Sequence, residues 1–401
     1  MNLISLISGV STPKSLWITL INWIESGIGN LGWTIILVTA LIKLVTTPLD
    51  FWVKLNTKRQ TLIQQKCAPQ IAKLQKKFGA DQNSLRLQTQ SIYKREGLDM
   101  RTGCIVMLIN TILSFTIFIT FYNDLRKVSA YEAIHQYEQI EATYTDNYYK
   151  AFCEYNPNGV EDEFIVQADV DNWIKSFNEM EDGTEKQAKA SFIKPYTEYA
   201  TRIASEKSVD YWKSTKSPST WLWVQNIWVA DASAKPFPSY AALKSIANNT
   251  GYTKYVNENI NEENYNKIAS LISDNAKRST NGYYILPILA GLVTFLAQYI
   301  AELHTKLKNK KANTLAQTAG SQANTTMKMM KFIMPVVMII FTLSASASFG
   351  LYILSSNISS ILLGELTTIG IDKITKKQRL QVEEELEKEA NRLIRKGKIK
   401  E

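Results

Sequence analysis

The apolar residues of this chain are concentrated in four long runs, at 31–53, 103–123, 283–301 and 332–364. Lys43 and Asp50 are the only charged residues of the first run, and the other three runs carry no charge. A membrane-spanning helix needs about 20 consecutive apolar residues. Soluble surface helices keep a polar face and therefore rarely extend that far without a charge. The pattern predicts an all-α polytopic membrane protein rather than buried helices of a soluble protein.

The last apolar run is too long for a single span. A helix of 33 residues would be about 50 Å long, whereas the hydrocarbon core of a bilayer is about 30 Å thick. We therefore expect two spans, 332–346 and 347–365, joined by a tight turn near 344–348. With 31–53, 103–125 and 283–302 they make a predicted core of five transmembrane helices.

Polar segments separate the predicted spans. Segment 1–30 contains an amphipathic stretch, 16–28, that we expect to lie in the membrane interface, with a short spanning helix near the start as the alternative. Segment 54–102 has helical periodicity, a turn signal at 78–81 and a second helix at about 82–95 ending near Gly97, which predicts a cytoplasmic helical hairpin.

Two further segments form a long connection between the second and third spans. Segment 126–220 is acidic and rich in tyrosine, and we expect a separately folded, α-helical extracytoplasmic insert. Segment 221–282 begins with Trp221 and Trp223, followed by Trp228, and these side chains are suited to the outer membrane interface. Segments 303–331 and 366–401 form a basic loop and a basic tail.

The charges indicate which polar segments are cytoplasmic. Basic residues outnumber acidic ones 11 to 3 in 54–101, 6 to 0 in 303–331 and 10 to 7 after residue 371, whereas 126–283 has 17 bases and 22 acids. Short basic loops stay in the cytoplasm. A five-span chain with its N-terminus outside and its C-terminus in the cytoplasm places the three basic segments in the cytoplasm and the acidic segment outside. The net charge of +9 is thus a topology signal, and no DNA partner is predicted.

The chain lacks the usual signatures of enzymes. It contains no phosphate-binding loop, no zinc-protease motif and no nucleophile elbow. The three cysteines have no metal-binding spacing, and the two histidines fall on opposite sides of the predicted membrane. We therefore predict neither catalysis nor a cofactor nor a metal site.

Lys43 is the most specific chemical feature of the sequence. A lysine at the centre of a spanning helix costs about 2.5–3.5 kcal/mol on insertion scales. Polar residues share its helix face or recur at helical spacing in other spans, and they predict a hydrated cavity around Lys43; the alternative is that Lys43 only pairs with Asp50. The residues assigned to this cavity are Thr39, Thr46, Thr47, Asn110, Ser114, Gln298, Tyr352 and Ser356.

Several short sequences follow one another in a recognisable order. They are Thr-Pro-Leu at 47–49, Ala-Pro-Gln-Ile-Ala at 68–72, Tyr-Lys-Arg-Glu-Gly at 93–97, Gly-Cys-Ile at 103–105, Trp-Leu-Trp at 221–223, Ile-Leu-Pro-Ile-Leu-Ala-Gly at 285–291, Met-Met-Lys-Phe-Ile-Met-Pro at 329–335 and Leu-Tyr at 351–352. With Lys43 before them, they make the chain resemble the YidC/Oxa/Alb family of membrane-protein insertases, bacterial type, over about 31–125 and 221–365. The enlarged extracytoplasmic loop departs from the usual pattern, as do Val106 and Ile112 at positions where prolines are usual.

The resemblance implies an insertase and chaperone of a bacterial cell membrane that performs no chemical reaction. Lys43 takes the place of a cation in a hydrophilic groove, Gln298 matches a groove-lining position, and Asn110 stands where a glutamine is usual. The implied partners are nascent membrane proteins and the lipid bilayer, with a Sec translocon and, through the basic tail, a ribosome as further candidates. The alternatives are a small-solute transporter or channel, and a membrane receptor built around the outer insert.

Overall fold

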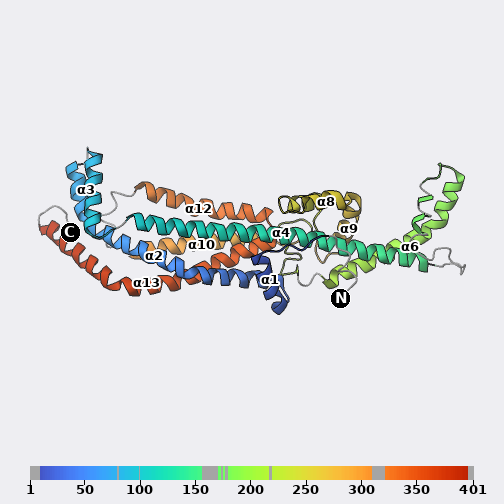
Figure 1. Ribbon diagram of the computed structural model, residues 1–401, viewed down its shortest axis with the longest axis horizontal. Helices are drawn as coiled ribbons and strands as arrows, with labels where there is room; N and C mark the ends of the chain where they lie inside the picture. Colours follow the sequence, from blue (N-terminus) through green and yellow to red (C-terminus); the bar gives the residue numbers. More distant parts are fainter. Residues whose placement is uncertain are drawn as a thin grey trace. The chain divides into compact units, whose positions relative to one another are not determined.

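The computed structural model describes residues 10–78, 81–98, 100–155, 170–172, 175–176, 179–215, 219–308 and 321–395. Over these residues the chain is helical, and its β-structure is one isolated bridge between Trp221 and Val224. Helices α2 (Leu31–Phe78), α4 (Met100–Glu154) and α13 (Ala347–Arg395) each continue far beyond their apolar stretch (Figure 1). The other helices are α1 (Leu16–Ile28), α3 (Gln82–Arg95), α6 (Thr184–Thr215), α7 (Tyr240–Ala247), α8 (Thr253–Asn259), α9 (Glu262–Asp274), α10 (Ile285–Lys308) and α12 (Ser321–Ser344).

Within the described part of the chain, three helices are long and apolar enough to cross a membrane, namely α2, α4 from Ile105 and α13 to Glu389. Two shorter apolar stretches lie in α10 and α12, at Ile285–Ile300 and Phe332–Ser344. In the most apolar 18-residue window of α4 only 11% of the residues are buried. Exposed apolar side chains at this density are stable in lipid and not in water, so the protein is a membrane protein.

The chain divides into two compact units. The span unit comprises residues 36–121, 286–342 and 350–401, and the insert unit comprises residues up to 35, 122–285 and 343–349. Helices α2, α4, α12 and α13 each contribute residues to both units. The expected turn between the last two spans falls in the insert unit, where α12 ends at Ser344 and α13 begins at Ala347.

The insert unit is built around one apolar core. Its buried residues come from α4 beyond Val128, from α6, and from α7 to α9, and Tyr265 of α9 packs between Tyr137 and Phe237 with ring centroids 4.7 and 5.9 Å apart. The stretches on the two sides of the expected boundary at residue 220 share this core. A smaller cluster forms farther along α4 and α6, around Phe152, Ile193 and Ala200.

Two of the tryptophans expected near the membrane interface are buried within the protein. Trp221 and Trp228 are only 5% and 1% exposed. Trp221 packs edge-on against Trp33, with ring centroids 5.6 Å apart. The loop that carries them also pairs with the turn before α13, because the backbone N–H of Ala347 donates to the carbonyl of Val229 at 2.9 Å.

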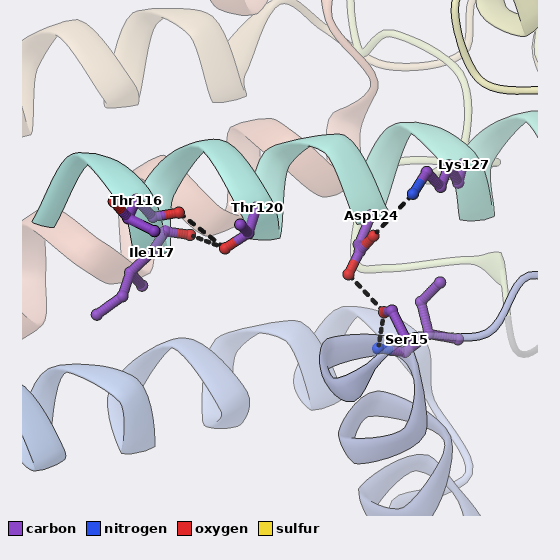
Figure 2. A network of polar contacts seen from close by, with 7 residues as sticks. Ser15, Thr116, Ile117, Thr120, Asp124 and Lys127 are labelled. Atoms are coloured by element: carbon purple, nitrogen blue, oxygen red, sulfur yellow. Dashed lines mark hydrogen bonds and ion pairs between the residues drawn. The ribbon is translucent and has the colours of Figure 1, made fainter. Parts of the chain in front are cut away.

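Helix α1 has the bounds that the amphipathic pattern predicted, and its first turn is fastened to α4. Ser15 caps α1 by accepting a hydrogen bond from the Ile18 backbone N–H at 3.2 Å. The Ser15 hydroxyl donates to the buried carboxylate of Asp124, which also lies 3.4 Å from the Lys127 ammonium (Figure 2). A carboxylate near a helix N-terminus is favoured by the helix dipole, and this contact joins the start of α1 to α4.

Candidate functional site

The charged residues of the first apolar run lie on one face of α2. Lys43, Thr47, Asp50 and Lys54 are spaced at i, i+4, i+7 and i+11, which is the spacing of neighbouring positions along a helix face. They line a cavity of about 210 Å³ in the span unit. This volume is large enough to hold several water molecules, so charged side chains here can remain solvated.

Helix α13 forms the opposite wall of this cavity. It contributes Ser360, Leu363, Gly364 and Thr367, again at helical spacing. The Lys54 ammonium donates a hydrogen bond to the Thr367 hydroxyl at 3.3 Å. Gly364 lies next to the same ammonium, since an added Cβ would be 3.4 Å from Lys54 Nζ, an ordinary contact distance.

The cavity carries two cations and one carboxylate. Asp50 accepts a hydrogen bond from the Asn110 amide of α4 at 3.3 Å. The Lys43 ammonium makes no hydrogen bond or ion pair with any residue in the described part of the chain, so the alternative in which Lys43 only pairs with Asp50 is not realised as a direct contact. The formal charge of the lining side chains is thus +1, and the arrangement suits an acidic or strongly polar guest.

The threonines predicted around Lys43 have different roles in the structure. The hydroxyls of Thr46 and Thr47 both donate to the Lys43 backbone carbonyl, at 3.1 and 2.7 Å, and Thr39 is fully buried. Of these three, only Thr47 lines the cavity. Hydroxyls bonded to the preceding turn are common in spanning helices, so the helix backbone satisfies Thr46.

The remaining predicted site residues lie elsewhere in the span unit. Asn110 reaches the cavity only through Asp50. Ser114 is exposed, whereas Gln298 and Ser356 are half-buried and do not line the cavity. Tyr352 is buried and packs against Phe121, with ring centroids 4.8 Å apart, which makes it a packing residue.

Sequence reasoning missed Lys54, Ser360, Gly364 and Thr367. Lys54 was assigned to the hairpin because it follows the apolar run, although it continues the Lys43 face by one turn beyond Asp50. Ser360, Gly364 and Thr367 continue the spacing of Ser356 by successive turns of α13. Extending each polar face beyond the apolar run would have revealed these residues.

The chain is similar in sequence to a family of membrane proteins. The family described as "60Kd inner membrane protein" matches residues 23–202 and 214–373. Proteins named "Membrane protein insertase YidC" are similar over shorter stretches. That of Wolinella succinogenes is 27% identical over 106 residues, or 26% of this chain and 19% of the relative. That of Helicobacter pylori strain 26695 is 28% identical over 111 residues, or 28% and 20%. That of Bordetella avium is 31% identical over 104 residues, or 26% and 17%.

These matches cover about a fifth of the length of the curated relatives. No solved structure matches the chain significantly.

Proposed function

Because the chain belongs to the 60Kd inner membrane protein family, we propose that it inserts nascent membrane proteins into a bacterial cell membrane and helps them fold. The observation that carries this proposal is the net-positive cavity between α2 and α13, reached from a cytoplasmic hairpin in the proposed topology. That topology has five spans, with the N-terminus outside and the C-terminus in the cytoplasm. A chain with no enzyme signature and one hydrated, charged cavity in its membrane region is suited to binding rather than to catalysis.

The proposed mechanism lowers the cost of moving a polar segment across lipid. An aspartate at the centre of a spanning helix costs about 2.5–3.5 kcal/mol. Lys43, Lys54 and the hydroxyl groups of the cavity would replace part of the water that such a carboxylate loses. The apolar part of the nascent helix enters lipid at the same time, and burial of its surface drives the step.

The two lysines have distinct proposed positions along this path. Lys54 lies one turn beyond Asp50, nearer the hairpin, and Lys43 lies deeper in the apolar run of α2. A carboxylate arriving from the cytoplasm would meet Lys54 first and Lys43 second. The Asp50 carboxylate, which accepts a hydrogen bond from Asn110, lies between the two lysines along α2 and would repel an acidic guest. This repulsion would prevent the guest from binding too tightly to be released.

The test is insertion into liposomes that contain the purified full-length protein. The substrate is a single-span protein with an acidic extracytoplasmic tail, and a second substrate has the same tail neutralised to Asn and Gln. We expect Lys43→Gln to lower insertion of the acidic substrate about tenfold, equivalent to about 1.4 kcal/mol, and the neutral substrate much less. Lys43→Arg should retain activity, and Lys207→Gln, on α6 of the insert unit, is the matched control.

Two results would contradict the proposal. Equal insertion of the acidic substrate by wild type and Lys43→Gln would remove the electrostatic part of the mechanism. Rapid solute flux through the same liposomes, without insertion of either substrate, would favour a transporter or channel. A photo-crosslinking residue at Leu44, which is 56% exposed, should capture the nascent substrate on ribosomes, and its failure to do so would argue against a groove at this position.

A Sec translocon and a ribosome are proposed as further partners. Segments 303–331 and 366–401 are basic and cytoplasmic in the proposed topology, and basic segments bind ribosomal RNA through its phosphates. Co-sedimentation with ribosomes should fall when the basic residues after Arg392 are removed. Co-purification with a translocon tests the other partner independently.

A further inference from the structure

The insert unit contains a second and larger cavity, of about 490 Å³. Its walls come from α4 at 122–129, where the uncharged run ends, from the loop at 228–233, from α7 and from the turn between α12 and α13. Cavities of 300–1,000 Å³ are typical of small-molecule sites. None of its lining residues belongs to the Lys43 cavity, so its ligand is a separate question.

Among the described residues that line this cavity, Arg126 is the only charged one. Its guanidinium donates to the Asn248 carbonyl at 2.7 Å and lies over the Tyr122 ring at 5.8 Å from the centroid. A guanidinium has five N–H donors in a planar fork, so the bond to Asn248 leaves donors for a second acceptor. The contacts with Asn248 and Tyr122 hold the group at the cavity wall.

The described residues of the cavity wall include no carboxylate that would offset this charge. Asp124, on the neighbouring position of α4, is engaged by Ser15 and Lys127. Asp231, on the loop that forms another wall, is 1% exposed and lies beside Gly282. Neither residue lines the cavity, which therefore has a positive electrostatic character.

Serine hydroxyls provide further donors along the wall. They come from Ser129, Ser233, Ser245, Ser344 and Ser346. Trp228 also lines the cavity, but its indole Nε1 is buried from solvent. The Arg126 guanidinium and the serine hydroxyls are therefore the groups that can meet the oxygens of a ligand.

The wall also carries apolar side chains. Leu125, Val229, Ile246 and Phe349 line the cavity together with the donors. A ligand that suits both surfaces has an anionic, oxygen-rich head and an apolar body. Inorganic phosphate would satisfy Arg126 alone and leave the apolar wall unused.

The position of the lining residues in the sequence indicates where such a ligand comes from. Arg126 follows the uncharged run of α4, which ends at Asn123, and Ser344 ends the apolar stretch of α12. In the proposed topology both ends face outward, so the cavity lies at the level of the outer lipid headgroups.

We propose that this cavity binds the headgroup of an anionic phospholipid from the outer leaflet. Arg126 and the serine hydroxyls of the wall hold the phosphate oxygens, and Leu125 and Phe349 contact the first part of the lipid body. The inference rests on the proposed topology but not on insertase activity, because lipid binding is measured without any substrate protein.

Native mass spectrometry of the full-length protein in mild detergent tests the proposal, with phosphatidylglycerol titrated as the probe. Arg126→Gln should weaken phosphatidylglycerol binding at least fivefold. Ala242→Phe keeps the charge but fills the cavity from α7, and it should weaken binding by a similar factor. Arg202→Gln, an exposed arginine on α6 that does not line the cavity, is the matched control and should bind as wild type does.

Competitors distinguish the source of the anion. Phosphatidylcholine should bind at least threefold more weakly than phosphatidylglycerol, and millimolar inorganic phosphate should not displace the bound lipid. Displacement by inorganic phosphate would overturn the proposal in favour of a simple anion site. Displacement by a short acidic peptide that is then retained would overturn it in favour of a polypeptide site.

Two variants, Arg126→Gln and Ala242→Phe, are used so that the proposal can still be tested if one of them is misfolded. The helical circular dichroism signal and a cooperative thermal transition establish that each variant is folded. Wild-type affinity for phosphatidylglycerol in any folded variant that alters Arg126 or Ala242 overturns the proposal. Normal insertion by these variants, with lipid binding lost, would leave the insertase proposal intact.

Discussion

Gly32 is a position where one added methyl group has a predictable steric cost. An added Cβ would lie 2.2 Å from Trp221 Cδ1 and 2.8 Å from Trp221 Cβ. Trp221 cannot move freely because it is buried against Trp33. We expect Gly32→Ala to lower the free energy of unfolding of the insert unit by about 1–3 kcal/mol, the usual cost of overpacking.

Thermal unfolding followed by tryptophan fluorescence measures this effect. Gly27→Ala is the control, since nothing lies within 4 Å of an added Cβ at Gly27 and alanine favours the helix more than glycine does. Equal midpoints for Gly32→Ala and Gly27→Ala would show that the Trp221 side chain can shift without a loss of stability.

Glu132 gives the insert unit a pH-dependent stability. Burial raises the pKa of its carboxyl to about 7, and the nearby Glu25 carboxylate adds to the shift. Between about pH 4.5 and pH 7 the folded chain therefore keeps a proton that the unfolded chain has lost. Because the folded state binds more protons, the free energy of unfolding falls as the pH rises through this window.

Glu132→Gln should remove this part of the pH dependence. Burial lowers the pKa of the nearby His135 imidazole, which reduces stability at low pH in both proteins. The informative quantity is therefore the difference between the two midpoints of thermal unfolding, measured from pH 5 to pH 8. Wild type should lose stability relative to Glu132→Gln as the pH rises, and a constant difference would contradict the shifted pKa.

Helices α2 and α13 remain paired beyond their apolar stretches and lie side by side in Figure 1. The Lys66 ammonium lies 2.9 Å from Glu96 and 3.6 Å from Glu385. Lys73 pairs with Glu389. Exposed pairs contribute only about 0–1 kcal/mol each. The buried side chains of this region, which include Leu62, Cys67 and Val382, should therefore contribute more to holding the tail against the hairpin.

Val382→Asp tests this contribution of α13. A charge at a position that is 5% exposed should cost several kcal/mol and separate α13 from the hairpin. We expect limited proteolysis within 54–101 to become at least tenfold faster. Leu380→Asp, at a position that is 50% exposed on the same helix, should change the rate little, and similar rates for both variants would contradict this role of Val382.

Local sequence signals predicted some elements better than others. The bounds of α1 and α3 match the predicted helices, because capping residues such as Ser15 and Asp81 mark their first turns. The unbroken course of α13 from its span into the tail was not predicted. The end of an apolar run marks the membrane surface, and a helix does not need to end there.

The candidate site was predictable in part for a similar reason. Lys43 and Thr47 stand out because a charge in an apolar run and its helical neighbours are visible in one sequence. Gly364 and Thr367 become site residues only because α13 packs on this face of α2. Which helix packs on which depends on contacts across more than 300 residues, and periodicity within one element does not encode it.

The core of the insert unit is assembled from segments that are far apart in the sequence, which limits the deletions that the protein can tolerate. The larger apolar cluster of the insert unit joins residues from 130–144, 204–212 and 237–272. Deletion of 127–220 would remove nine of its 21 buried residues and expose the remainder. We therefore expect that variant to lose its cooperative transition, so a loss of function there would not identify a receptor.

A smaller deletion separates the two hypotheses. Residues 151–200 contain every buried member of the smaller cluster and none of the larger one. Ala151 and Ala200 belong to the same cluster, so a short Gly-Ser linker can join Lys150 to Thr201. We expect this variant to unfold cooperatively and to insert the acidic substrate at a rate close to that of wild type, because neither the Lys43 cavity nor the larger cluster is touched. If it folds but no longer inserts, whereas Lys43→Gln inserts normally, the protein acts through its insert and the receptor hypothesis replaces the groove.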